Sequence, residues 1–262
     1  MPLARLLLWL LSLACIVFAL GAFGSPPPVW QPVLLLLGLA TLATLGTLFP
    51  RLQIYTAVLQ SVAAGRKRVA LTFDDGPHPE TTRRVLALLA EHGAKATFFV
   101  VGQKVERYPD VVREIVAAGH ELGLHGFVHD RLYSLRSTTY VQQDIARTQH
   151  AIETACGVQT RLFRPPIGFV GHLIAIAADR ADVELVAWSA RGLDGWSGAR
   201  AERVLPRLLR GLRDGAIVML HDASEREAFV PVSLELLPEL LNELHQRGLK
   251  AVSVTELMLR DE

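Results

Sequence analysis

Two long runs of apolar residues occupy the first fifty positions of this 262-residue chain. Residues 6–23 and 30–49 contain no charged side chain, and each approaches the roughly 20 apolar residues with which a helix crosses the hydrocarbon core of a bilayer. The sequence GSPPP at 24–28 separates them, and it cannot continue a helix because proline lacks the N–H group and restricts the residue before it. The pattern predicts a two-helix transmembrane hairpin over residues 1–50.

A cleaved signal peptide is the alternative for the first run, because Arg5 precedes an apolar core that ends in small residues. The second run shows no amphipathic face, which favours a membrane span over a buried helix. Basic residues lie before the first run and after the second, and the connecting loop has none. The positive-inside rule therefore predicts that both ends of the hairpin, and the domain that follows, face the cytoplasm at an inner or plasma membrane.

Residues 51–67 form a juxtamembrane linker in this interpretation. They mix apolar residues with Gln and Tyr before a basic cluster at 66–68, a composition that suits the interface beside anionic headgroups. A plain connecting segment fits the same pattern.

Short apolar runs alternate with helical patterns in the remainder of the chain. Strands are predicted at 69–73, 96–101, 121–125, 161–163, 183–188, 216–220 and 250–254. Helices are predicted between them at 81–91, 109–118, 138–155, 172–181, 201–212 and 232–246. Alternating strands and helices indicate parallel βαβ units. We therefore expect an α/β domain over 68–262, built as a distorted (β/α)7-type barrel with its reactive groups at the carboxyl ends of the strands.

Composition and charge are consistent with a membrane hairpin followed by an α/β domain. Half of the residues are hydrophobic and 20% are charged, with the apolar excess concentrated in the first fifty positions. The formal net charge of +1 gives no sign of a nucleic-acid partner. Cys15 and Cys156 are the only cysteines and are far apart in sequence, so no disulfide framework is expected.

The first predicted strand ends in two adjacent carboxylates, Asp74 and Asp75, followed by Gly76-Pro77. Two carboxylates this close repel each other unless a cation neutralises them, and a metal ion is the natural cation. Taken alone, the sequence Asp-Gly-Pro is more typical of a solvated turn.

Two histidines, His125 and His129, follow the third predicted strand at a spacing of four residues. Such a pair can converge on one ion. Together with one carboxylate it makes an open three-ligand site, which leaves a position for water that a metal can activate. Either histidine alone would more often be an ordinary surface residue.

Further polar residues follow the later strands. Arg164 and Pro166 come after the fourth strand, and Asp194 and Trp196 come after the fifth. His221 directly follows the strand at 216–220 and is placed to protonate a leaving amine. The alternative is a rim histidine that Asp222 holds by a hydrogen bond.

These segments together resemble the polysaccharide deacetylase family, the NodB-homology domain of carbohydrate esterase family four. The similarity spans about residues 68–256, and its five motifs occur in the family's order. They are TFDDGP at 72–77, the histidine pair, RPP at 164–166, Asp194 with Trp196, and MLH at 219–221.

The resemblance implies a role for each site residue in hydrolysis of the N-acetyl amide of an amino sugar. Asp75, His125 and His129 would hold a divalent metal, Zn first, with Co, Ni or Mn as further candidates. Asp74 would deprotonate the attacking water, and His221 would protonate the departing nitrogen.

Supporting roles also follow from the resemblance. Arg164 would pair with Asp74 and keep it ionised, and Asp194 would orient His221. The backbone N–H of Ile167, next to Pro166, would stabilise the oxyanion with the metal. Trp196 and Met219 would form the walls of the acetyl pocket.

The sequence departs from the family pattern at three points. Gly126 stands where a Ser or Thr is usual between the histidines, so a hydrogen bond that steadies the metal loop is lost. Ile167 replaces an aromatic residue, and one residue separates Asp194 from Trp196. None of these changes removes a metal ligand, the base or the acid.

Two other functions stay open at this point. One is a membrane-bound carbohydrate-binding pseudoenzyme, and the other is a deformylase or an amidase for a non-sugar substrate. A membrane-tethered site that faces the cytoplasm favours a lipid-linked saccharide as the substrate of a deacetylase. The sequence does not indicate the sugar or the oligomeric state.

Overall fold

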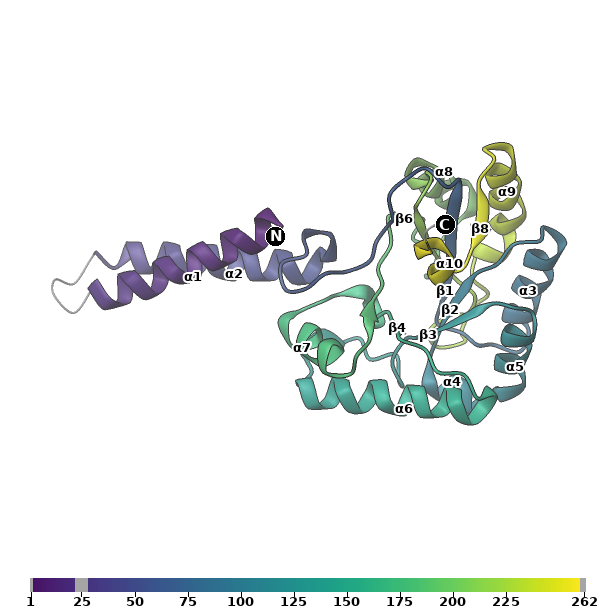
Figure 1. Cartoon of the computed structure of the whole chain (residues 1–262), viewed down its shortest axis with the longest axis horizontal. Coiled ribbons are helices and arrows are strands. Elements are labelled where there is room, and N and C mark those ends of the chain that lie inside the picture. The colour runs from purple at the N-terminus through teal and green to yellow at the C-terminus, as the bar shows by residue number, and fades with distance from the viewer. Residues whose placement is uncertain (1, 22–27, 260–262) are drawn as a thin grey trace.

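The computed structural model describes residues 2–21 and 28–259. Two antiparallel helices, α1 (Leu3–Gly21) and α2 (Trp30–Leu48), project from a single α/β domain (Figure 1). Both are apolar and exposed along most of their length, and both are long enough to cross a membrane. At 1.5 Å per residue each helix is about 28 Å long, close to the hydrocarbon thickness of a bilayer. Most of the loop predicted between them lies outside the described residues.

One parallel sheet organises the domain. Its strands are β1 (Arg68–Asp74), β2 (Thr97–Val100), β3 (Glu121–Leu124), β4 (Leu162–Phe163), β5 (Glu184–Leu185), β6 (Ala190–Arg191), β7 (Ile217–His221) and β8 (Lys250–Val252). They lie in the order β5-β4-β3-β2-β1-β7-β6, and β8 pairs with the start of β1. The sheet is therefore a partly open barrel, which confirms the predicted distorted (β/α)7 fold.

The single strand predicted at 183–188 is wrong in its extent. The N–H of Val186 donates to the carbonyl of Phe163, on the β4 side, whereas the N–H of Ser189 donates to Ile217 in β7. This segment crosses from one limb of the sheet to the other, so a continuous strand cannot form. Two short strands, β5 and β6, result.

Helices cover the outside of the sheet (Figure 1). The predicted ones appear as α3 (Thr81–Glu91), α5 (Pro109–Ala117), α6 (Thr138–Cys156), α7 (His172–Arg180), α8 (Ala201–Gly211) and α9 (Ser233–Gln246). The short helices α4 (Gly102–Arg107) and α10 (Val254–Met258) and the 3-10 turns η1 (Pro50–Leu52), η2 (Tyr133–Leu135) and η3 (Pro166–Gly168) were not predicted, because they are too short to show a helical period.

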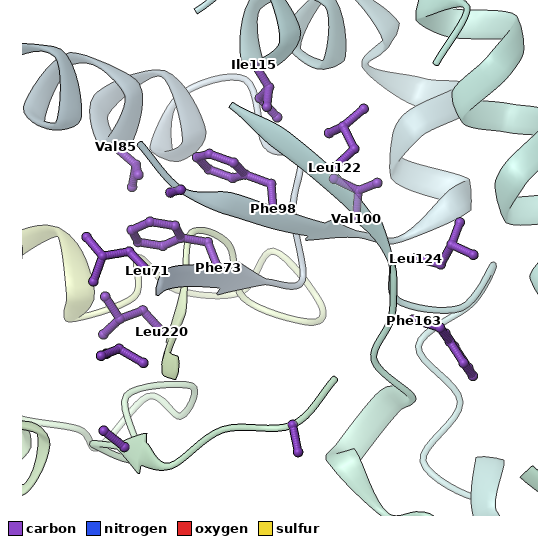
Figure 2. Close-up of a cluster of buried hydrophobic side chains, with 14 of the residues drawn as sticks. Leu71, Phe73, Val85, Phe98, Val100, Ile115, Leu122, Leu124, Phe163 and Leu220 are labelled. Atoms are coloured by element: carbon purple, nitrogen blue, oxygen red, sulfur yellow. The ribbon is translucent and has the colours of Figure 1, made fainter. Parts of the chain in front are cut away.

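A dense apolar core lies between the sheet and these helices (Figure 2). Phe73 of β1 and Phe98 of β2 stack with ring centroids 5.2 Å apart, and both are fully buried. Leu71, Leu122 and Leu220 extend the same cluster. Because closely packed protein interiors deform little, the strands hold the residues at their ends in fixed positions.

Residues 53–62, within the predicted juxtamembrane linker, are hydrogen-bonded to the domain. The N–H of Leu59 donates to Leu185 over 2.8 Å, and the N–H of Ala187 donates to Leu59 over 2.7 Å. The N–H of Val62 donates to Gly215 over 2.9 Å. The segment therefore lies beside the open part of the sheet, between the β5 and β7 limbs.

The hairpin is attached to the domain at the end of α2. The carbonyl of Thr47 accepts a hydrogen bond of 3.2 Å from the N–H of Val170, just before α7. Arg5 donates to the carbonyls of Gln53 and Ile54 over 2.9 and 3.0 Å. These contacts fix where the domain lies relative to the last turn of α2.

Candidate active site

The two adjacent carboxylates reach one site because the backbone turns at Asp75. Asp74 is still in β1, aligned with His221 of β7. Asp75 has a φ of 73°, in the left-handed region, so the side-chain alternation of the strand ends there.

The structure brings Asp75, His125 and His129 together. Their ligand atoms all lie within 4.8 Å of one another. Asp75 Oδ1 is 3.4 Å from His125 Nε2 and 3.3 Å from His129 Nε2. The second ring nitrogen of His125, Nδ1, is 2.7 Å from the carbonyl of Arg164, to which it donates in the neutral tautomer. This orients Nε2 toward Asp75 as a ligand atom.

The chemistry of this triad fits a divalent cation. Asp75 Oδ1 is buried and has no hydrogen-bond partner among the described residues, an arrangement that is costly without a compensating charge. Burial by itself raises the pKa of Asp75, but the imidazoles of His125, His221 and His129 lower it overall, so the carboxylate form is favoured. Two imidazoles and one carboxylate make a donor set that zinc accepts in open sites.

Arg164 pairs with Asp74 as the resemblance implies. Its Nη1 donates to Asp74 Oδ1 over 2.6 Å and to Thr72 Oγ1 over 2.8 Å. The guanidinium is fully buried and lies 4.1 Å from the centre of the Phe99 ring. It also donates to the carbonyls of Val186 and Ala187. A buried arginine with all these partners holds the Asp74 carboxylate in one position.

His221 is held by Asp194 and not by Asp222. Its Nδ1 is 3.1 Å from Asp194 Oδ1, and its backbone N–H donates to Asp194 Oδ2 over 2.8 Å. Burial lowers the pKa of His221, but the charge and the hydrogen bond of Asp194 outweigh it and raise the pKa to about 10. The imidazole is therefore a protonated group with a proton to donate.

The glycine between Asp194 and Trp196 lies against His221. A Cβ atom at Gly195 would stand 2.6 Å from the His221 ring, so only glycine fits there. The irregular spacing of this motif thus accommodates the imidazole.

A cavity of about 460 Å³ opens over these groups. Met219, Ile167 and Trp188 form part of its wall. Ile167 has a φ of 64° at the turn η3, and the neighbouring Pro166 is buried.

Trp196 does not line this cavity, which corrects the expectation that it is a wall of the acetyl pocket. It is 61% exposed, and its ring packs close to Gly198 within its own loop. Trp188 takes the place of an aromatic wall.

Several residues that sequence reasoning missed support the metal loop. Asp144 Oδ2 accepts hydrogen bonds from the N–H of Phe127 and the hydroxyl of Tyr133 over 2.9 and 3.0 Å. Because Phe127 follows Gly126, Asp144 supplies an anchor where the usual Ser or Thr is absent. Gly126 itself has a φ of 79° and packs against Pro166.

Glu225 is a further group at the rim. Its Oε1 lies 3.6 Å from His129 Nδ1, and Arg131 holds the carboxylate at 2.7 Å. Since Glu225 is in the irregular loop after β7, no periodicity or strand end could point to it.

Lys104 and Asp222 lie behind the triad. Lys104 Nζ donates to the carbonyls of Asp75 and Ser224, each over 2.8 Å. Asp222 accepts a short hydrogen bond from the hydroxyl of Thr82 and packs against Gly76, and burial raises the pKa of Asp222 to about 6. Both residues therefore stabilise the turn at residues 74–77 through contacts with Asp75 and Gly76.

Sequence comparison relates this chain to known deacetylases. A profile described as polysaccharide deacetylase matches residues 61–186. A peptidoglycan-N-acetylglucosamine deacetylase of Bacillus cereus is 33% identical over 204 residues, which cover 77% of this chain and 92% of that protein. The chain belongs to the polysaccharide deacetylase family.

A longer relative and a solved structure extend the comparison. The peptidoglycan-N-acetylglucosamine deacetylase PgdA of Listeria monocytogenes is 36% identical over 195 residues, and the chain spans only 40% of its length. The crystal structure of a carbohydrate esterase family four pseudoenzyme from Bacillus anthracis superposes with a TM-score of 0.69 at 28% identity, covering 79% of this chain and 70% of that one. Members of this family thus include a protein that keeps the fold without the activity.

Proposed function

We propose that this protein is a membrane-anchored, metal-dependent deacetylase that hydrolyses the N-acetyl amide of an amino sugar. The observation that carries the proposal is the position of Asp74 and His221, paired across two strands beside the Asp75, His125 and His129 triad. A pseudoenzyme would not be expected to keep all five. The names of the relatives support N-acetylglucosamine as the sugar class.

Asp75, His125 and His129 would hold the divalent metal, with zinc as the first candidate and cobalt, nickel or manganese as alternatives. A metal bound there would lower the pKa of water and polarise the acetyl carbonyl.

The chain's own residues then divide the proton transfers. Asp74, held in place by Arg164, accepts a proton from the attacking water. His221, oriented by Asp194, donates its proton to the amide nitrogen as the C–N bond breaks. The N–H of Ile167 stabilises the oxyanion. Water and the acetamide are thereby converted into acetate and a free amine, and Asp74 and His221 exchange protons with solvent before the next turnover.

The two apolar helices support the membrane part of the proposal. Their length and their exposed apolar surface suit a hairpin that spans an inner or plasma membrane, and the basic residues at both ends suit a cytoplasmic domain. A reporter fused to the carboxyl terminus should be active in the cytoplasm. Activity of that reporter on the outer side would contradict this orientation.

Acetate release from N-acetylglucosamine oligomers tests the activity. The full chain in detergent should release acetate when zinc or cobalt is supplied and should stop when a chelator removes the metal. Asp74→Asn should lower kcat by about 10³-fold or more, since a general base contributes roughly 10² to 10⁴. Metal content of the variant, measured by atomic emission, should stay at the wild-type level.

Three outcomes separate the candidate functions. Saccharide binding without acetate release would favour the pseudoenzyme. Release of formate from formylated substrates, with no acetate, would favour a deformylase. Undiminished acetate release by Asp74→Asn would remove Asp74 as the base.

A further inference from the structure

A second cavity, of about 620 Å³, lies beside the active site and is rich in arginine. We call it the arginine groove. The end of α2 with η1, the turn η3, the segment 187–191 and helix α8 with the residues after it form its walls. Among the described residues, the lining contains no aspartate or glutamate, and it contains five arginines: Arg51, Arg191, Arg207, Arg210 and Arg213.

These five arginines carry positive charge along the groove. Among residues 2–21 and 28–259 none of the five forms an ion pair, whereas Arg83 and Arg131 elsewhere on the surface pair with glutamates. Arg51 lies over the ring of Phe49 and Arg191 over the ring of Trp188, each at 5.5 Å. All five are exposed to solvent. The groove is therefore a surface that favours anions.

One end of the groove opens onto the active site. Four residues line both cavities: Ile167, Gly168, Trp188 and Arg191. A ligand in the groove can thus extend past Trp188 toward the triad.

The other end of the groove reaches the last turn of α2. Leu48, Phe49 and Pro50 line it there, at the point where the hairpin is tied to the domain through Thr47 and Val170. In the orientation proposed above, this is the level of the membrane surface.

We propose that the arginine groove binds the phosphate or diphosphate of a lipid-linked N-acetylated amino sugar and so directs the sugar into the active site. Guanidinium groups bind phosphate oxygens in bidentate fashion, and the groove places them between the lipid surface and the triad. This inference rests on the proposed deacetylase function and names its substrate class.

The kinetic test uses the full chain in phosphatidylcholine nanodiscs with metal supplied. Acetate release is compared for N-acetylglucosaminyl diphosphopolyprenol and for a neutral N-acetylglucosamine tetramer. The double variant Arg207→Gln/Arg210→Gln should lose at least tenfold more kcat/KM on the diphosphate substrate than on the neutral tetramer. Arg203→Gln is the matched control, because Arg203 is on the same helix but does not line the groove.

Two further arms identify the source of the phosphate. A soluble sugar diphosphate that is used as well as the lipid-linked one would assign the groove to the diphosphate alone and overturn the lipid-linked class. A different outcome is that added phosphatidylglycerol inhibits the wild type but not the double variant, and that the enzyme shows no preference for the diphosphate substrate. This outcome would assign the arginine groove to lipid headgroups and contradict its role in substrate binding.

A binding measurement keeps the inference separate from the activity. Metal-free protein is titrated with inorganic pyrophosphate by calorimetry, and the dissociation constant should rise at least tenfold in the double variant and not in Arg203→Gln. Equal weakening in both variants, or no pyrophosphate binding to the wild type, would contradict the proposal that the arginine groove binds phosphate. Acetate release without these effects would support the deacetylase proposal and contradict the role of the arginine groove. Pyrophosphate binding without acetate release would contradict the deacetylase proposal.

Discussion

The two ends of strand β3 carry histidines in opposite environments. His125 follows the strand and lies among polar groups, with the Arg164 carbonyl on one ring nitrogen and Asp75 facing the other. His120 precedes the strand and packs against the ring of Phe98, with centroids 5.5 Å apart. Its Nδ1 accepts a hydrogen bond from the N–H of Ala96.

Burial lowers the pKa of His120 to about 4, with a smaller contribution from the charge of Lys95. His120 is therefore neutral at physiological pH and acts as a packing residue. The comparison teaches that burial alone does not make a histidine functional. What differs is the set of neighbours: His125, at the carboxyl end of β3, lies beside Asp75, whereas His120, at the amino end, packs against Phe98.

The largest expected effect is on activity at the carboxyl end. His221→Gln removes the proton donor but keeps an amide that can reach Asp194, so kcat should fall by about 10³-fold. The thermal midpoint and the metal content should remain near the wild-type values. His120→Asn, at the amino end, should leave kcat unchanged at pH 7.5. A comparable loss of kcat in that variant would contradict the assignment of His120 as a packing residue.

The next effect is on stability and distinguishes charge from packing. Arg164→Met leaves Asp74 as a buried carboxylate without its partner, which should lower the free energy of unfolding by roughly 3–5 kcal/mol. Phe98→Ala should cost a similar amount, about 3–5 kcal/mol, through the cavity it creates.

Activity of the folded protein should separate these two variants. Acetate release per folded molecule should collapse in Arg164→Met and persist in Phe98→Ala. Thermal unfolding and acetate release at low temperature provide both readouts. Equal retention of activity would mean that Arg164 serves packing alone.

The smallest effect is a pH dependence that arises at the amino end. The pKa of His120 is about 4 in the folded protein and near 6.5 when unfolded, so the unfolded chain binds the proton more readily between these values. Stability is then present above pH 6.5 and is lost as the pH falls toward 4. Between pH 7 and 5 the loss should be about 2 kcal/mol.

His120→Asn should remove this part of the pH dependence, because the amide keeps an acceptor for Ala96 but does not titrate. The wild-type thermal midpoint should fall roughly 4–8 °C more than that of the variant over this pH range. Parallel curves for the two proteins would show that His120 is not the titrating group.

The sequence alone predicted which residues converge, because each of them lies at or just after the end of a predicted strand. Parallel strands present their carboxyl ends on one edge, so Asp74, Asp75, His125, Arg164 and His221 had to lie near one another once the strands were recognised. The two apolar helices and the main helices of the domain could also be predicted from the sequence. Helical periodicity and uncharged runs are properties of neighbouring residues in the chain.

Tertiary structure decided what no local pattern contains. It placed Trp188, and not Trp196, in the wall of the cavity over the site. It put Asp194 beside His221, as the resemblance implied, and left Asp222 bound to Thr82. It also brought Asp144 beneath the metal loop.

The same holds for the arginine groove and for the edge segment at 53–62. The lining of the groove runs from Leu48 to Arg213, and the segment 53–62 bonds to Leu185 and Gly215. Pairings at such separations depend on how the whole sheet closes, and the sequence near each residue carries no record of that closure.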